Sequence, residues 1–304
     1  MRLFLSGLIV LLAGLSAAAA TTDEVVAAAY PSALSQIATQ HHYAEQREQP
    51  YAAVLVSGKS YIVAAYTNGH VAAISLIDGS TSPPATRQVI RDHQTGVEPT
   101  VTAVDLDRDG APEAVVTFTL GPRGGAQTWI YRIAQGSLVS IGPVDAHGYS
   151  LLGDPDIVDF DGAGTMDLVD SINVGESRRE PVIVKQHYAL RDGVYVALEA
   201  LDFYEVFYRA KAAPAATTET FSVSADALQK PYRLTVINGG FNGEEYHSSS
   251  GSVSLNGATI ASPGDFNQQR SSWTVPVTLQ RSNSLAVRLD GKPKSRIIVA
   301  IRHD

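Results

Sequence analysis

The sequence of 304 residues contains no cysteine, which excludes disulfide bonds, thiolate metal ligands and catalysis by a thiol. Charged residues are few, at 18%, whereas hydrophobic residues make up 44%, a composition that supports a folded core. The formal net charge is −8. Because proteins that bind nucleic acids need a basic surface to contact phosphates, this charge argues against a nucleic acid partner.

Long hydrophobic runs are missing after the N-terminus, so we expect no membrane span in the mature chain. Residues 1–20 (MRLFLSGLIVLLAGLSAAAA) place Arg2 before an apolar run that ends in small residues. This layout is typical of a secretory signal peptide cleaved near Ala20. A membrane anchor is the alternative, although the apolar run is short for one. The sequence therefore predicts a secreted or periplasmic protein.

Several catalytic motifs are also absent. The sequence has no G-x-S-x-G, no H-E-x-x-H and no glycine-rich nucleotide-binding pattern, which argues against α/β-hydrolases, zincin metalloproteases and nucleotide-dependent enzymes. A carboxylate pair for glycoside hydrolysis stays open, because the separation that defines such a pair is not visible in a sequence.

The rest of the chain divides by its pattern into four parts. Residues 21–50 read as an N-terminal segment of one or two short helices. Residues 51–210 consist of short apolar runs separated by Gly, Asn and Asp, which is typical of antiparallel strands. Residues 211–219 (KAAPAATTE) read as a linker. Residues 220–304 contain six or seven expected strands, enough for a small β-sandwich, and we expect residues 219–304 to fold alone.

An internal repeat organises the part before the linker. Residues 101–120 (VTAVDLDRDGAPEAVVTFTL) align with residues 155–174 (PDIVDFDGAGTMDLVDSINV), so that Asp105 corresponds to Asp159. A degenerate copy without the acidic residues precedes them at residues 51–79. Three units of about 50 residues with four strands each are typical of propeller blades. The fold class expected is therefore all-β: a β-propeller-like array of four-stranded blades, followed by a β-sandwich.

The first repeat contains the sharpest local motif, the sequence DLDRDGAPE at residues 105–113, which we call the first acidic loop. Acidic side chains occupy positions 1, 3, 5 and 9, a glycine at position 6 permits a sharp turn, and a backbone carbonyl is available at position 7. Oxygen ligands in this number suit a hard cation, with Ca²⁺ ahead of Mg²⁺. The expected ligands are Asp105, Asp107, Asp109, Glu113 and the carbonyl of Ala111. An acidic turn in solvent that holds no ion is the alternative.

The second repeat carries a weaker version at residues 159–167, the second acidic loop. Its expected ligands are Asp159, Asp161, Asp167 and the carbonyl of Thr165. Ala163 stands where the acid of position 5 should be, so this loop has either a weaker Ca²⁺ site or a purely structural turn. Both loops lie in the acidic part of the chain. Between Thr21 and Ala210 there are 24 acidic and 12 basic residues, against 7 and 10 between Lys211 and Asp304. Calcium should therefore stabilise the first part and leave the sandwich nearly indifferent.

These loops resemble the FG-GAP/VCBS repeats of secreted bacterial proteins, which are related to the cation-binding blades of the integrin α-subunit propeller. The resemblance covers about residues 51–208 and is most specific in the first acidic loop. It implies a β-propeller with Ca²⁺ in the loops between the first two strands of a blade. Such families usually have about seven blades, whereas three units are recognisable here. Either a divergent fourth blade uses residues 22–50 and 195–208, or the array stays open or closes by association.

The C-terminal part resembles the Ig-like β-sandwich modules that are appended to exported bacterial proteins, which implies a fold but no activity. Five polar or aromatic residues of this part could contact a glycan, or could equally belong to turns and core: Asn238, Asn242, Tyr246, Asn267 and Trp273. The function expected for the whole chain is an exported, calcium-binding, non-catalytic binding or adhesion module with a glycan or protein ligand at the cell surface. The alternative is a secreted polysaccharide-processing enzyme, a lyase or glycoside hydrolase, with its site on the propeller face.

Overall fold

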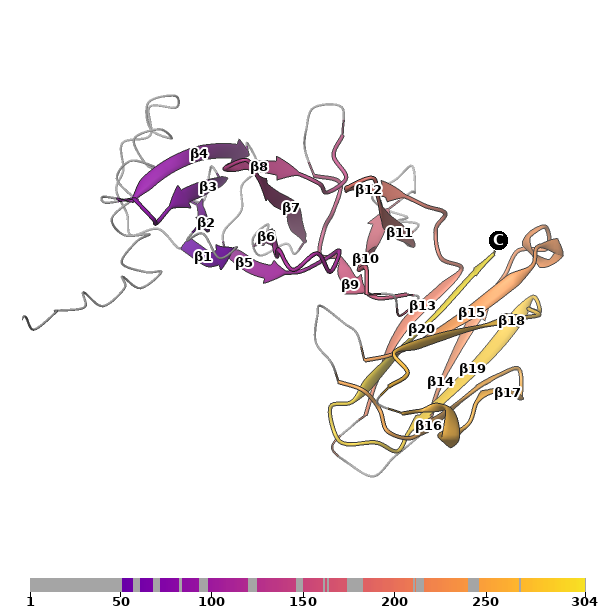
Figure 1. Cartoon of the computed structure of the whole chain (residues 1–304). Coiled ribbons are helices and arrows are strands. Elements are labelled where there is room, and N and C mark those ends of the chain that lie inside the picture. Colours follow the sequence, from indigo (N-terminus) through magenta and orange to yellow (C-terminus); the bar gives the residue numbers. More distant parts are fainter. Residues whose placement is uncertain are drawn as a thin grey trace, which may run out of the picture.

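The computed structural model describes residues 51–303 apart from the following positions: 57–60, 68–71, 82–83, 93–97, 120–124, 146–149, 161, 163, 174–182, 210, 212–215, 240–245 and 268. The expected signal peptide and the expected N-terminal helical segment lie outside the described residues. Five four-stranded antiparallel sheets account for the described strands, as Figure 1 shows. Two one-turn 3₁₀ helices, η1 (Ala227–Gln229) and η2 (Pro263–Asp265), accompany them. None of the described helices has the length and hydropathy of a membrane-spanning segment.

The first three sheets are blades whose strands pair in sequence order, as the repeat predicts. Blade 1 contains β1 (Tyr51–Val56), β2 (Tyr61–Thr67), β3 (Ala72–Asp78) and β4 (Ala85–Asp92). Blade 2 contains β5 (Glu98–Val104), β6 (Glu113–Thr119), β7 (Ala126–Ala134) and β8 (Ser137–Ser140). Blade 3 contains β9 (Asp156–Val158), β10 (Asp167–Asn173), β11 (Ile183–Arg191) and β12 (Val194–Ala197). The prediction of an all-β fold with four-stranded units is confirmed.

The outer hairpins of blades 2 and 3 close through the same kind of turn. Gln135 and Gly136 join β7 to β8 with φ values of 52° and 75°, and Asp192 and Gly193 join β11 to β12 with φ values of 49° and 82°. Two successive residues with positive φ make a type I′ turn, whose twist matches that of the strands. These turns fix the register of the last strand in blades 2 and 3.

The blades stack face to face, and each interface buries its own apolar cluster. Between blades 1 and 2 the cluster includes Leu76 of β3, Phe118 of β6 and Trp129 of β7, and the last two rings meet edge to face at 5.6 Å. Between blades 2 and 3 it includes Leu106 and Ile130 from one side and residues of β9 to β12 from the other. In the described part of the chain the blades form a row and not a closed ring (Figure 1).

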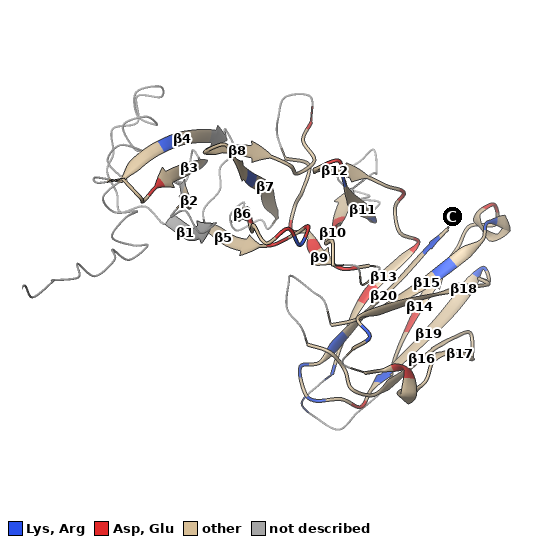
Figure 2. Ribbon diagram, in the orientation of Figure 1, with Lys and Arg blue, Asp and Glu red and all other residues tan. Residues whose placement is uncertain are grey.

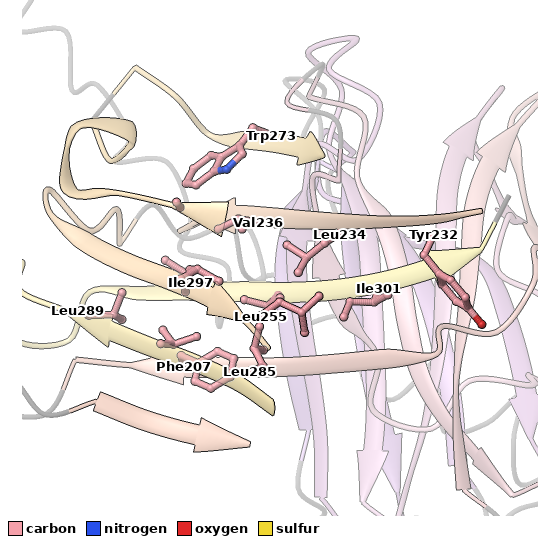
Figure 3. Packing of buried hydrophobic residues seen from close by; sticks show 14 of the residues in the cluster. Phe207, Tyr232, Leu234, Val236, Leu255, Trp273, Leu285, Leu289, Ile297 and Ile301 are labelled. Atoms are coloured by element: carbon pink, nitrogen blue, oxygen red, sulfur yellow. The ribbon is translucent and has the colours of Figure 1, made fainter. Parts of the chain in front are cut away.

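The last two sheets form a β-sandwich. The inner sheet has the order β13 (Phe203–Tyr208), β20 (Arg296–His303), β15 (Tyr232–Asn238) and β18 (Ser272–Val277). The outer sheet has the order β14 (Ala216–Ser222), β19 (Ser282–Leu289), β16 (Gly251–Leu255) and β17 (Ala258–Ala261). Alternate residues of both sheets meet in a core that Figure 3 shows from close by.

The boundaries of the sandwich differ from the expected ones. Strand β13 falls inside the expected propeller-like range 51–210, yet it pairs with β20 of the sandwich through six residue pairs. Its Phe207 lies in the sandwich core beside Leu285 (Figure 3). Strand β14 begins at Ala216, inside the expected linker 211–219. The sandwich therefore starts near Phe203. The boundary predicted from the sequence was wrong because β20, the strand that pairs with β13, is almost 90 residues away along the chain.

The inner sheet also continues the row of blades. Its second face packs on blade 3 through a cluster that contains Val158, Phe160 and Val169 of blade 3 and Ile237, Ile298 and Ala300 of the inner sheet. Phe160 of blade 3 corresponds in the repeat to Leu106 of blade 2, and each is buried against the sheet that follows. The inner sheet thus stands where a fourth blade would stand, and residues 195–208 contribute β12 and β13 to two different sheets instead of forming a blade.

Candidate metal centre

The first acidic loop connects β5 to β6 between strands, as predicted, and lies at the junction of blades 2 and 3 (Figure 2). Leu106, at its second position, is fully buried in the cluster between these blades. Gly110 at position 6 has φ of 83°, a conformation that favours glycine. One buried apolar residue thus anchors a loop whose neighbouring residues stay near the surface.

The carboxylates at positions 1, 3 and 5 converge. Asp105, Asp107 and Asp109 each offer one oxygen, and these oxygens lie within 4.8 Å of one another. One carboxylate oxygen of each residue accepts a backbone N–H of the loop: Gly110 N to Asp105 Oδ2 at 3.1 Å, Asp109 N to Asp107 Oδ1 at 3.2 Å, and Ala111 N to Asp109 Oδ1 at 2.7 Å. The backbone therefore holds the three side chains in place around a common point.

The donor set fits a calcium ion. Two oxygens on opposite sides of a Ca²⁺ ion are about 4.8 Å apart, since the usual Ca²⁺–oxygen distance is about 2.4 Å, and the three oxygens lie within that separation of one another. Asp105 Oδ1 is buried without a hydrogen-bond partner among the described residues, and an orphaned buried carboxylate oxygen is costly unless something satisfies it. Ala111 is exposed in this loop, at the position where the sequence predicted a carbonyl ligand.

Glu113 does not join the other carboxylates. It begins β6 with an exposed fraction of 1%, and it accepts hydrogen bonds from Arg132 Nε at 2.9 Å and from Leu106 N at 3.0 Å. Arg132, which lies on β7 next to the partner of Ala114, also pairs with Asp107. The fourth expected side-chain ligand is thus placed in an ion pair that fastens the loop to blade 2.

Burial sets the electrostatics around this ion pair. Burial raises the pKa of Glu113, against the opposing effects of Leu106 N–H and Arg132. Burial also opposes the charge of Arg132, but its hydrogen bond to Glu113 and the charges of Glu113 and Asp107 raise its pKa overall. Tyr195 of blade 3 donates its hydroxyl to Met166 O at 2.9 Å, and burial raises its pKa far above the ordinary value. Glu113 and Tyr195 are therefore buried at the junction, whereas the three converging carboxylates lie nearer the surface.

The second acidic loop is arranged differently, and its described carboxylates already have partners. Asp159 is buried, with its Oδ1 accepting Gly162 N at 2.7 Å and its Oδ2 lying 3.8 Å from Arg108 Nη2 of the first loop. Asp167 Oδ2 lies 3.0 Å from Nε2 of the buried His187. Thr165 is partly buried, and Asp161 lies outside the described residues. Among the described residues, the only three-carboxylate group with converging oxygens is that of the first loop.

The residues singled out in the sandwich are mostly structural. Asn238 is fully buried and bonds the backbone of Ser248 and Asn267, and Trp273 lies in the core, where its ring meets Phe266 edge to face at 5.3 Å. Tyr246 is exposed, with the guanidinium of Arg296 4.9 Å from its ring centre. Asn242 lies outside the described residues. The turn-and-core alternative thus holds for Asn238 and Trp273.

The sequence did not indicate a role at the junction for several residues. Arg132, His187 and Tyr195 come from the third and fourth strands of their blades, between 19 and 29 residues after their partners along the chain. Arg132 could be placed opposite Glu113 from the sequence only if the register of the β6–β7 hairpin were known. The residues between the two strands do not define a unique turn length, so the sequence does not fix that register. The motif assigns no role to Arg108, because only the fold brings the two loops together.

Comparisons with known proteins leave the family open. No family model matches the chain, and no curated protein matches it. Among solved structures, an exo-β-1,3-galactanase from Phanerochaete chrysosporium with bound galactose is 10% identical, with a TM-score of 0.22 over 85% of this chain and 69% of its own. A structure described as a glycoside hydrolase is 9% identical, with a TM-score of 0.16 over 83% of both chains. TM-scores of this size do not establish a shared fold.

Proposed function

We propose that this protein is an exported, calcium-stabilised, non-catalytic binding module whose blade row carries one structural calcium site in the first acidic loop. The observation that carries the proposal is the convergence of Asp105, Asp107 and Asp109, with a buried oxygen of Asp105 that lacks a hydrogen-bond partner among the described residues. The N-terminal sequence supports export, because it has the layout of a secretory signal peptide.

Calcium at this position would supply positive charge to three crowded carboxylates and so relieve their mutual repulsion. The residues around it hold the loop to both neighbouring blades. Leu106 O accepts Met166 N from blade 3 at 2.8 Å, and the Glu113–Arg132 pair ties the loop to blade 2. A cation that binds only the folded loop would therefore stabilise the junction, by about 2.7 kcal/mol at a hundredfold excess over Kd.

Calorimetric titration of calcium tests the site. The double variant Asp105→Asn with Asp109→Asn should lose the tightest binding event, because it removes two of the three charges that converge. Asp226→Asn is the matched control, since Asp226 is exposed in the sandwich and makes no side-chain cap hydrogen bond. An unchanged titration of the double variant would overturn the proposed site.

The enzyme alternative needs two carboxylates that face one substrate, and the buried Asp170 and the partly buried Asp156 of blade 3 are the obvious pair. Burial raises the pKa of both Asp156 and Asp170. Asp156 is opposite Val169 in the β9–β10 ladder, and successive residues of a strand point to opposite faces. Asp170 accordingly accepts Gly153 N on the side of blade 2, whereas Asp156 lies near Tyr204 on the side of the sandwich. This arrangement favours a structural role for both and supports the non-catalytic proposal.

A glycan array, probed with the purified chain in calcium and again in EDTA, tests the binding role. Capture of defined glycans that weakens in EDTA and in the Asp105→Asn, Asp109→Asn variant would support a calcium-dependent module. Shortening of a soluble polysaccharide by the same preparation, measured as new reducing ends, would favour the enzyme instead. Asp156→Asn and Asp170→Asn then serve as the variants that separate catalysis from a contaminating activity.

A further inference from the structure

We infer that the guanidinium of Arg108, which projects from the first acidic loop, supplies the positive charge of the second acidic loop, so that the second loop takes no calcium ion. The inference goes beyond the proposed function, and only its contrast with a calcium-binding first loop rests on that proposal. Arg108 lies between two expected ligands of the first loop, Asp107 and Asp109, and the motif assigns it no role.

The position of Arg108 is the first argument. Arg108 has φ of 58°, a conformation that an arginine adopts at an energetic cost. Its Nη2 atom lies 3.8 Å from Asp159 Oδ2 of the second loop. The Asp159 side chain is 6% exposed, whereas that of Arg108 is 59% exposed. A buried carboxylate needs a positive partner, and the arginine reaches it from the solvent side, as an ion would.

The glycines at position 6 of the two loops supply the second argument. Gly110 and Gly164 are 54 residues apart, the period of the repeat, and both have positive φ. The space in front of Gly110 is open, since a Cβ added there would meet no atom within 4 Å, whereas a Cβ at Gly164 would overlap Nε, Cζ and Cδ of Arg108. The arginine side chain therefore lies directly on the turn of the second loop. The same space over the first loop is free.

The remaining described carboxylate of the second loop is the third argument. Asp167, at position 9, pairs with His187, and the ring of this histidine packs against Phe160 with the ring centres 4.7 Å apart. Asp159 uses its other oxygen for Gly162 N. Position 5 is Ala163, which has no ligand atom in its side chain. The two described carboxylates of the second loop thus already have partners within the protein.

The arrangement also links the two loops mechanically. The first loop contacts the second through the hydrogen bond from Met166 N to Leu106 O at 2.8 Å and through Arg108 two residues later. An ion that fixes Asp107 and Asp109 fixes the residue between them. Ordering of the first loop by calcium would therefore hold Arg108 in the second loop and couple blade 2 to blade 3.

Counting calcium ions by equilibrium dialysis tests the inference. The wild-type chain should bind one ion per molecule. Arg108→Gly should bind two, because glycine adopts the same φ and the substitution removes the arginine side chain from the second loop. Adding Asp159→Asn to Arg108→Gly should return the count to one, and Arg108→Lys, which keeps the charge, should bind one. Arg191→Ala, which removes an exposed arginine from blade 3, is the control and should bind one.

Two results would overturn the inference. One is a wild-type chain that binds two ions and loses one with Asp159→Asn alone, a variant that keeps the test informative even if Arg108→Gly does not fold. The other is an Arg108→Gly protein that folds and binds no additional ion. A wild-type chain that binds no ion, with Arg108→Gly binding one, would refute the proposed site in the first loop and leave the role of Arg108 standing.

Discussion

Replacing Glu113 by alanine separates a structural anchor from a metal ligand. Glu113 is 1% exposed and accepts hydrogen bonds from Arg132 Nε and Leu106 N. Its removal leaves a guanidinium and a backbone N–H without their acceptor in the interior. Breaking a buried ion pair costs about 3–5 kcal/mol. The Arg132 side chain is 28% exposed and keeps Asp107 as a partner, so water and Asp107 compensate in part and we expect about 3 kcal/mol.

The assay uses the two tryptophans of the chain, one in each part of the structure. Trp129 lies between blades 1 and 2, and Trp273 lies in the sandwich core. In a Trp273→Phe background, the fluorescence of Trp129 reports unfolding of the blades. A loss of about 3 kcal/mol should lower their Tm by roughly 6–12 °C for a unit of about 150 residues. The decrease should be equal in EDTA and in calcium, because Glu113 is not among the carboxylates whose oxygens converge.

Asp109→Asn provides the contrast. Asp109 is exposed, and its replacement should leave the Tm in EDTA nearly unchanged while abolishing the increase of Tm that calcium produces. The reasoning would be refuted if Glu113→Ala kept its stability in EDTA and lost the calcium effect. Glu113 would then be a calcium ligand, as the spacing of the motif predicts, and the ion pair with Arg132 would not be what holds the loop.

Three further predictions follow from the geometry of the junction and the sandwich. Gly164→Ala should destabilise the blades more than Gly257→Ala destabilises the sandwich, because both glycines have positive φ but only Gly164 lies against Arg108. The backbone strain alone costs about 1–2 kcal/mol at either position. Urea unfolding measures both losses of stability, and equal losses would argue against the contact. Burial raises the pKa of Asp156, so its native pKa exceeds the unfolded one and its contribution to stability is lost as the pH rises above about 4. Asp156→Asn should flatten the decrease of unfolding free energy between pH 4 and 7, and parallel curves would contradict this. A fragment of residues 203–304 should unfold cooperatively when circular dichroism follows its thermal unfolding, whereas a fragment of residues 219–304 should not. The shorter fragment lacks β13 and the core residue Phe207, and loss of a buried phenylalanine side chain costs about 3–5 kcal/mol.

Local patterns in the sequence were sufficient for much of the architecture. The period of 54 residues between Asp105 and Asp159 predicted four-stranded units, and the structure confirms three of them. Alternating apolar residues and turn dipeptides such as Asp192-Gly193 act over a few residues, so strands and hairpins can be inferred from the sequence alone. The position of the first acidic loop between two strands was predictable for the same reason.

Contacts between distant residues were not predictable in this way. The sequence of β13 shows a strand but not its partner, and only the fold pairs it with β20 and moves the start of the sandwich to Phe203. Glu113 matches the ligand spacing of the motif, yet it forms an ion pair with Arg132, which the β6–β7 hairpin brings opposite to it. Arg108 gains a role only because stacking places blade 3 against blade 2. The sequence determines which residues can carry a charge and where strands form. Packing decides which of those charges form pairs, because electrostatic interaction depends on separation in space.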